Sequence, residues 1–400
     1  MKPMNQFDVS VDVVEKLRRD FVGRESALSA ALRNKRVVLG FDGYVDRLYQ
    51  LVERRDDPTS FAAMESMLTL ADRVAATAGS SCNLERVLKK KIAGGFAPNV
   101  ARCLAHLGFP VDLVGMLGLP EPDPLFTEFP DVVELHTIGN PGETVALEFA
   151  DGKVMLTDFG PINELTWEDL LSRLGGVERL AEMLERADAL GQGHWSLVPA
   201  MNQFWERLQG EVVPSLSDAT IRRMVLLVDP ADLKKRSRAD VRSMLKLLRG
   251  FEDAGLSCCL SLNDREAADV ASALESVGDA STREELHDVG RKINSVADLS
   301  LLVVHDPHFA TASTRDRHVL VQEGFTAKPK FTTAAGDHFN GGLLAGLLLG
   351  LAPEEALAVG NAVTAIFVRT GASPDLVATC AFLERYEEFV DADLPDFSLP

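Results

Sequence analysis

Short apolar runs rich in β-branched residues recur along most of this chain, with segments of helical periodicity between them. The first, VVLGF at 37–41, ends just before an Asp-Gly pair. Similar runs occupy 111–115, 189–191, 224–229, 258–262 and 299–305. Uninterrupted apolar strands are typically buried on both faces, and their alternation with helices indicates a parallel sheet with helices on both sides. The predicted fold class is α/β, a three-layer αβα domain with a mainly parallel central sheet.

Three segments depart from this alternation. Residues 143–157 contain two β-prone stretches joined at Asp151-Gly152, a pair that favours a tight hairpin, so we expect a small β lid there. Residues 47–93 are predicted to be a mainly helical insertion. Residues 1–35 are predicted to be an N-terminal helical extension, with one amphipathic helix in 10–33. The main domain is then expected over 36–385, followed by a C-terminal tail at 386–400.

The composition excludes several classes of protein. A formal charge of −19 argues against a nucleic-acid partner, which needs a basic surface. The longest apolar stretch, at 339–352, is too short to span a bilayer, and the first residues do not form a secretory signal, so we expect a cytoplasmic protein without membrane contact. The cysteines are odd in number and lack a CxxC pair, which indicates reduced packing residues: Cys82, Cys103, Cys258, Cys259 and Cys380.

The strongest chemical signal is FTTAAGDHFNGGLLAGLLLG at 331–350. Small residues precede an acid and a long apolar helix, so anionic oxygens could approach the unpaired N–H groups at the helix start. Asp337 would then enter the first turn, where a carboxylate can accept the proton of an attacking hydroxyl. Taken alone, Gly-Asp at this position is also the pattern of a plain helix cap.

The string TTAAGDHFNGG closely resembles the C-terminal signature of the ribokinase-like (PfkB) carbohydrate kinase family. This resemblance implies that Asp337 is the catalytic base and that Thr333 lies beside the nucleotide. It also implies an anion hole built from small residues: Ala334, Ala335 and Gly336. Phe331 stands where the family usually has Asp. This difference is expected to change the contacts of the loop more than the role of Asp337 as the base.

A second resemblance lies in GGFAPNVARCLAHLG at 94–108, which is similar to the N-terminal signature of the same family. It implies that Gly94 and Gly95 bring the backbone close to a sugar and that Asn99 bonds to its hydroxyls. A turn that leads into an amphipathic helix ending at Gly108 would explain the glycines alone. Phe96 stands where ribokinases typically carry Lys, which points to a different substrate.

The segment GFDGYVD at 40–46 resembles the first strand of the family and the Asp that follows it. The resemblance implies that Asp46, and less directly Asp42, bind the hydroxyls of a polyol through their carboxylates. Two acids in a loop after a strand are otherwise solvent-exposed turn residues.

The segment SLNDREA at 261–267 resembles the NxxE motif of the family, which implies that Asn263 and Glu266 help to place phosphate and magnesium, the metal through water. A helix cap with a first-turn Glu gives the same letters. Asp229, at the end of a predicted strand, is a weaker candidate. The resemblance also places Asn361 near the nucleotide base, whereas 303–313 lacks the usual Thr-x-Gly and is expected to be an altered nucleotide loop.

Together these segments imply ATP- and Mg²⁺-dependent phosphorylation of a hydroxyl on a sugar or sugar-like small molecule by a carbohydrate kinase. In relatives a lid of this kind can form a dimer interface, so a homodimer through the lid is a further expectation. Two alternatives remain open. The early insertion and GFDGYVD also resemble ADP-dependent sugar kinases, and Phe331 would suit an idle nucleotide- or sugar-binding protein of the same fold.

Overall fold

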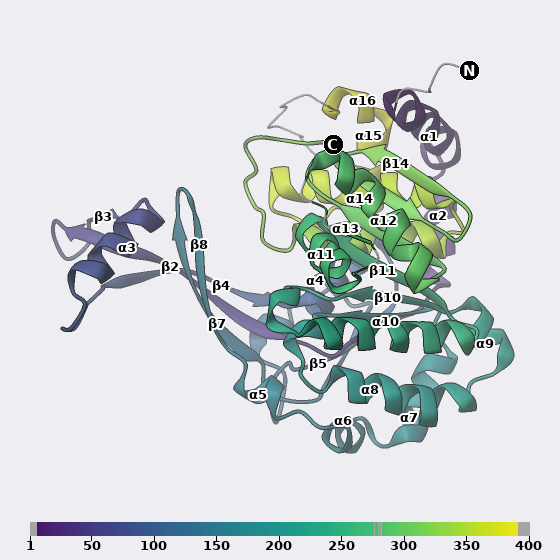
Figure 1. The fold of residues 1–400 in the computed structure, drawn as a ribbon, viewed down its shortest axis with the longest axis horizontal. Coiled ribbons are helices and arrows are strands. Elements are labelled where there is room, and N and C mark those ends of the chain that lie inside the picture. Colours follow the sequence, from purple (N-terminus) through teal and green to yellow (C-terminus); the bar gives the residue numbers. More distant parts are fainter. Residues whose placement is uncertain (1–5, 276, 279, 281, 391–400) are drawn as a thin grey trace.

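The computed structural model describes residues 6–275, 277–278, 280 and 282–390, and a nine-stranded sheet runs through its centre (Figure 1). Neighbouring strands follow the order β14-β13-β12-β11-β10-β9-β1-β5-β6. The strands from β12 to β6 pair in parallel, and β13 and β14 pair antiparallel at the edge. The bounds are β1 (Val37–Gly40), β5 (Val111–Gly115), β6 (Val133–Thr137), β9 (Ala189–Gly193), β10 (Val225–Asp229), β11 (Ser257–Asn263), β12 (Leu301–His305), β13 (Phe309–Ser313) and β14 (His318–Gln322). The predicted mainly parallel sheet is confirmed.

Helices cover both faces of this sheet because successive strand side chains point to opposite sides. Leu39 joins one buried apolar cluster and Val38 joins the other. The first cluster holds α1 (Gln6–Phe21), α4 (Phe96–Leu107), α13 (Ala335–Leu348), α14 (Pro353–Thr370) and α15 (Leu376–Glu384). The second holds α6 (Trp167–Leu174), α7 (Val177–Glu185), α8 (Met201–Arg207), α10 (Arg238–Asp253), α11 (Asp264–Ala273) and α12 (Arg283–Ala297). The three-layer α/β arrangement is therefore the one expected from the sequence.

Shorter elements complete the chain. The predicted N-terminal helix is divided, because Gly23 adopts a φ of +76° between α1 and α2. The remaining helices are α2 (Glu25–Arg33), α5 (Gly160–Asn163), α9 (Asp218–Arg223) and α16 (Tyr386–Phe389). Single turns of 3₁₀ helix lie at Pro124–Phe126, Trp195–Leu197, Val213–Ser215 and Leu233–Lys235, and a π-helix at Leu208–Val212. The tail predicted at 386–400 includes α16, and residues 391–400 lie outside the described residues.

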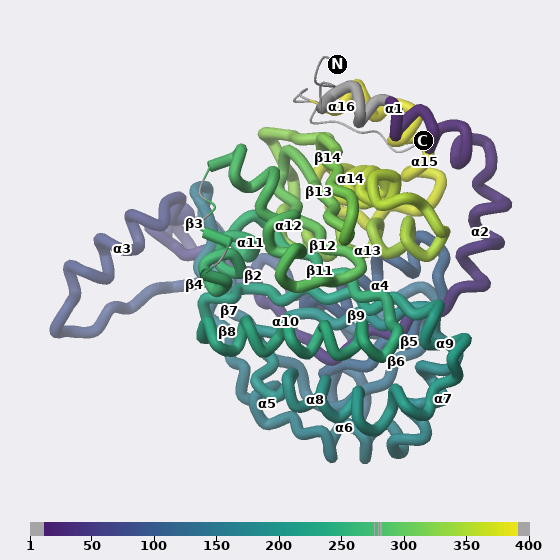
Figure 2. The backbone as a smooth tube through the Cα atoms, turned by 45° about the vertical axis from the view of Figure 1, so that its right-hand side comes forward, coloured from purple at the N-terminus to yellow at the C-terminus, as the bar shows by residue number. Residues whose placement is uncertain are grey.

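A second sheet projects from the body and forms the lid (Figure 2). Its strands are β2 (Tyr44–Arg55), β3 (Phe61–Ala63), β4 (Arg86–Gly94), β7 (Gly142–Phe149) and β8 (Gly152–Asp158). The expected hairpin is present, since β7 pairs antiparallel with β8 from Glu143↔Asp158 to Phe149↔Gly152.

The prediction of a mainly helical insertion at 47–93 is wrong. Most of β2, all of β3 and nearly all of β4 lie within it, and its one helix among the described residues is α3 (Met67–Ala76). The cause is visible in β4, whose middle residues are charged and exposed although the strand pairs antiparallel with β2. A lid strand of this kind carries little of the apolar alternation that identifies a strand in a sequence.

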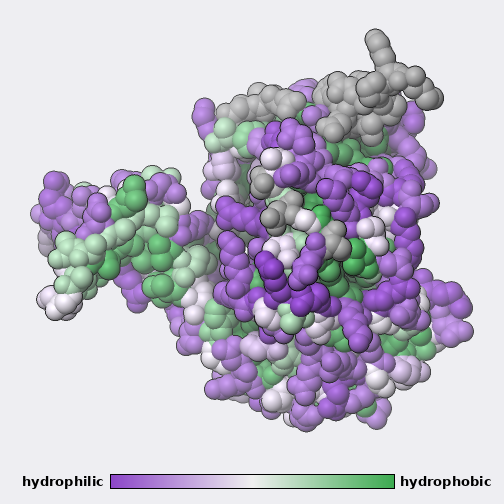
Figure 3. All heavy atoms as spheres, viewed as in Figure 1, coloured by the Kyte–Doolittle hydropathy of each residue, from purple (hydrophilic) through white to green (hydrophobic). Residues whose placement is uncertain are grey.

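Apolar side chains are exposed on the lid (Figure 3). Five large ones are 45% or more exposed: Leu68, Val74, Leu88, Met155 and Leu156. Elsewhere, Cys103, Cys258, Cys259 and Cys380 are buried and unpaired, as expected for packing residues. Within the described residues, none of the helices combines the length and the hydropathy needed to cross a bilayer.

Candidate active site

The start of α13 is a cradle of small residues at the carboxyl edge of the central sheet. Ala334 precedes the helix with a φ of 67°, and no side chain caps the helix start. A Cβ atom at Gly336 would stand 3.6 Å from the His305 ring, so the glycine leaves space on that side. Because the first N–H groups of a helix lack partners within it, this start suits an anion. The expected anion hole has the required local shape.

Of the cavities that border the segment 332–337, three include residues of the predicted anion hole, and each of these takes its name from one lining residue. The Asp46 cavity, of about 310 Å³, includes Gly94, Asn99, Thr333 and Ala334. The Asp229 cavity, of about 520 Å³, includes Asn263, Glu266, Ala334, Ala335, Gly336 and Asp337. The Glu323 cavity, of about 380 Å³, includes His305, Ala335, Gly336, Phe339 and Thr364. The predicted anion hole is therefore a wall that the three cavities share.

Asp337 lines the Asp229 cavity and bonds to Asn99, which lines the Asp46 cavity. It lies in the first turn of α13 and is 8% exposed. Asn99 Nδ2 donates a hydrogen bond of 2.8 Å to Asp337 Oδ2, so the residue of the second signature orients the predicted base. Burial, together with the nearby charge of Asp229, raises the pKa of Asp337 to about 7, against the opposing effect of His194. A carboxyl with this pKa can exchange a proton near neutral pH.

The paired glycines make room for two carboxylates. A Cβ atom at Gly94 would collide with the carboxylate of Asp46, and one at Gly95 would lie 2.8 Å from Asp42 Oδ2. Gly95 also has a φ of +107°, which favours glycine. Burial raises the pKa of Asp46, whose side chain faces the Asp46 cavity. Asp46, Gly94 and Asn99 thus come together as predicted.

Asp42 has a different position from the one expected. It is fully buried, and its carboxylate accepts hydrogen bonds from the backbone N–H groups of Phe96 at 2.8 Å and Ala97 at 2.9 Å. These donors belong to the first turn of α4, which carries Asn99. The structure gives Asp42 the role of a cap for α4, in place of the substrate contact expected from the sequence. Its two oxygens are already engaged.

His194 was not identified from the sequence. It follows β9 with a φ of 52°, and its Nδ1 lies 2.9 Å from Asp42 Oδ2. Burial alone would lower the pKa of His194, but the charge of Asp42 and its hydrogen bond outweigh it and raise the pKa to about 10, with smaller contributions from Asp337 and Asp229. The imidazolium therefore balances several acids of the site. A histidine three residues after the predicted strand at 189–191 was the available signal.

The Asp229 cavity gathers further acids. Asn263 caps α11 through a reciprocal pair of bonds with Glu266, so the helix-cap interpretation of these letters is correct in its geometry. Both residues nevertheless line the cavity. Burial and the charge of Asp229 raise the pKa of Glu266 to about 9. Asp229 in turn accepts a hydrogen bond of 2.8 Å from Asn340. Acidic oxygens around one cavity fit a hard cation such as Mg²⁺.

Asn361 does not line the Glu323 cavity. That side chain is fully buried and donates to Tyr386 Oη at 3.0 Å, away from the lining residues. Thr364, one turn later on α14, lines the cavity instead, and its Oγ1 donates to the Ala335 carbonyl at 2.9 Å. The predicted loop at 303–313 consists of β12, a turn and β13, and the turn lines the same cavity.

A side chain of the lid hairpin contacts the segment before the cradle. Lys153 Nζ of β8 donates to Thr333 Oγ1 at 2.5 Å, immediately before the cradle. The same ammonium lies 5.7 Å from the ring centre of Phe331, the residue that replaces the usual Asp. Thr333 therefore bonds to the lid and lines the Asp46 cavity. The sequence predicted that it lies beside the nucleotide.

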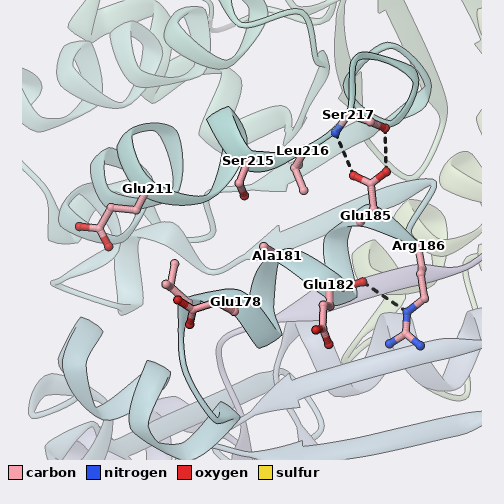
Figure 4. A pocket seen from close by; sticks show the side chains of 10 residues that line it. Glu178, Ala181, Glu182, Glu185, Arg186, Glu211, Ser215, Leu216 and Ser217 are labelled. Carbon is pink, nitrogen blue, oxygen red and sulfur yellow. Dashed lines mark hydrogen bonds between the residues drawn. The ribbon is translucent and has the colours of Figure 1, made fainter.

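Two other clusters lie apart from this junction. A cavity of about 880 Å³, larger than the three named above, is formed by α7 and the segment 211–217, with Glu185 bonded to Ser217 (Figure 4). It contains none of the predicted site residues. Asp112, Glu134 and His136 bring their ligand atoms within 4.8 Å of one another. Arg36 already pairs with both acids, so this group forms an ion-pair network.

Comparisons with known proteins identify the family of this chain. A family model for prokaryotic ketohexokinase matches residues 15–386. A ketohexokinase from Haloferax volcanii is 34% identical over 366 residues, which cover 89% of this chain and 93% of that protein.

Solved structures with the same fold include a ribokinase from Arabidopsis thaliana complexed with ribose and ATP. It is 17% identical, with a TM-score of 0.58, over 88% of this chain and 98% of that chain. A ribokinase from Cryptococcus neoformans in complex with ADP is 18% identical, with a TM-score of 0.56, over 86% and 98% of the two chains. The fold is therefore ribokinase-like, and the chain is a carbohydrate kinase that belongs to the prokaryotic ketohexokinase family.

Proposed function

We propose that this kinase transfers the terminal phosphoryl group of ATP to a hydroxyl of a ketohexose, with Asp337 as the general base. The observation that carries the proposal is the position of Asp337, which lines the Asp229 cavity at the uncapped start of α13 and bonds to Asn99 of the Asp46 cavity. The name of the Haloferax volcanii relative supports a ketohexose as acceptor. An acceptor in the Asp46 cavity and a donor in the other two would meet at this carboxylate.

The residues then have separate tasks. Asp46 and Asn99 bind and orient the acceptor, and Asp337 takes the proton of the attacking hydroxyl at its carboxylate. The N–H groups at the start of α13 stabilise negative charge on the transferred group. Asp229, Glu266 and Asn263 would hold Mg²⁺, partly through water, and the metal would neutralise phosphate charge when bound.

The lid is proposed to cover the acceptor and exclude water. Its β2 strand carries Asp46, and Lys153 of β8 already contacts Thr333. Excluding water matters because the same base could otherwise activate water and hydrolyse ATP. We also propose that the exposed apolar side chains of the lid, such as Leu156, contact a second copy of the chain, which sedimentation would reveal as a mass of two chains.

The direct test is phosphoryl transfer with purified protein, Mg²⁺ and either ATP or ADP as donor. The acceptors are a ketohexose (fructose), an aldohexose (glucose), an aldopentose (ribose) and a nucleoside. We expect transfer from ATP to fructose at the highest kcat/KM. Preferential transfer from ADP would identify an ADP-dependent kinase, and nucleotide binding without transfer to any acceptor would indicate an idle binding protein.

The rate should depend on pH through Asp337. Because the base accepts a proton only when ionised and its pKa is raised to about 7, kcat/KM should fall below neutral pH and level off above it. The expected slope is about tenfold per pH unit on the acid side. Initial rates at subsaturating fructose, on both sides of neutrality, measure it. A rate that stays flat well below neutrality would contradict the assignment of the base.

A further inference from the structure

Glu323 is a buried acid at the edge of the Glu323 cavity. It follows β14 directly and is 8% exposed. Its backbone N–H bonds to the His308 carbonyl at 2.9 Å, which fixes the main chain. Among the described residues, none donates a hydrogen bond to its carboxyl group. A buried polar group that lacks a partner costs free energy, so its retention calls for an explanation.

The surroundings do not supply a counterion. Of the described residues that line the cavity, none is Lys or Arg. Burial raises the pKa of Glu323 well above its ordinary value, and the nearby charge of Asp306 raises it further. His305, also on the lining, is held neutral because burial lowers its pKa to about 4. Burial and the charge of Asp306 therefore both favour the neutral, protonated form of the carboxyl group that faces the cavity.

A neutral carboxylic acid offers one donor and one acceptor side by side. The Watson–Crick edge of adenine presents the complementary pair, since N1 accepts and the N6 amino group donates. The rest of the lining suits the flat ring, because Phe339, Ala365 and Val368 are apolar and the cavity continues to Gly336 in the anion hole. A nucleotide with its phosphates at 334–336 would extend its base in this direction.

We propose that Glu323 recognises the N1 and N6 edge of the adenine base of the phosphoryl donor. This inference rests on the proposed function, because it takes the Glu323 cavity as the base site of a nucleotide that enters the reaction. The residue determines donor specificity and is remote from the transferred phosphoryl group. The motifs at 331–337 and 94–108 do not by themselves require an acid at this place.

The test removes the proposed contact first from the nucleotide, by changing the base, and then from the protein, by replacing Glu323. Equilibrium binding of ATP and of purine riboside triphosphate, which keeps N1 but lacks the N6 amino group, is measured by titration calorimetry with the wild-type chain, Glu323→Met and Glu323→Gln. Methionine fills a similar volume without a hydrogen bond, whereas glutamine keeps a donor and an acceptor. Glu178→Gln, in the remote cavity of Figure 4, is the matched surface control.

For the wild-type chain we expect ATP to bind about tenfold or more tightly than the analogue, the effect of a paired base contact. Glu323→Met should reduce that ratio to about one by weakening ATP binding, and Glu323→Gln should preserve most of it. An equal ratio in the wild-type and Glu323→Met chains would overturn the inference. Tighter binding of GTP than of ATP by the wild-type chain would also overturn the inference. Guanine pairs with an ionised carboxylate, whereas the proposed adenine contact requires a protonated one.

The outcome is independent of the sugar reaction. If the binding ratio depends on Glu323 but no sugar is phosphorylated, the proposed function fails and the adenine contact stands. If fructose is phosphorylated while the ratio is unaffected by Glu323→Met, the kinase assignment stands and the adenine contact fails. The circular dichroism spectrum of each variant confirms its fold, and Glu323→Gln tests the inference even if the Glu323→Met chain is unstable.

Discussion

Replacing Asp337 with Asn should lower kcat for phosphoryl transfer by about 10²- to 10⁴-fold, the usual contribution of a general base. The substitution keeps the size of the side chain, and its carbonyl oxygen can still accept the hydrogen bond from Asn99. It removes the ability to take a proton. Initial rates with saturating ATP and fructose measure the loss, and ATP binding should remain close to that of the wild-type chain.

Glu178→Gln is the matched control for this change. It makes the same exchange of carboxylate for amide, but on α7 in the cavity of Figure 4, which shares no residue with the three named cavities at 332–337. Its rate should equal that of the wild-type chain. If the Asp337→Asn variant kept more than a tenth of the wild-type kcat, another group would have to act as the base.

Replacing Gly342 with Val should destabilise the protein by about 3 kcal/mol in the free energy of unfolding. Gly342 lies in α13 where that helix crosses α14. A Cβ atom there would stand 2.9 Å from both the Cα atom of Gly360 and the carbonyl oxygen of Val359. These are backbone atoms of a buried helix, so no flexible side chain can move aside. Urea unfolding followed by circular dichroism measures the change.

Gly210→Val separates crowding from the general effect of valine. Gly210 is exposed, and a Cβ atom there would have no heavy atom within 4 Å. Its stability should change by less than about 1 kcal/mol, because valine and glycine differ little in helix propensity. Equal losses at the two positions would show that the contact between α13 and α14 is not the cause. Because α13 also carries Asp337, unfolding data should be compared with activity.

Much of the fold follows from local sequence patterns. The run at 37–41 becomes β1 because an apolar, β-branched segment of that length suits a buried strand. Asp151-Gly152 turns the chain between β7 and β8 because glycine readily adopts the positive φ, here +153°. The small residues at 334–336 and the apolar run after them identify a helix start that can approach an anion. Each of these effects acts over a few neighbouring residues.

The lid shows what local sequence patterns do not predict. The strand β4 has a run of exposed charges, and its pairing with β2 depends on residues about forty positions earlier in the chain. Asn361 shows the same limit in a helix, because the rotation of α14 directs it to Tyr386 and brings Thr364 to the cavity. Neither residue type nor spacing reveals which side of a buried helix faces a ligand.

The sequence by itself determined the sheet-and-helix architecture, the family and the position of Asp337 in the first turn of a helix, because these depend on periodicity and on contiguous motifs. Only the tertiary structure shows how Asp42 and Asp46, four residues apart, differ in their surroundings. The N–H groups of α4 bond to Asp42, while Asp46 is left facing a cavity. It also brought His194 and Glu323 to the site from distant strands. Their environments depend on long-range packing, which sets burial and hydrogen bonding and cannot be read from neighbouring residues.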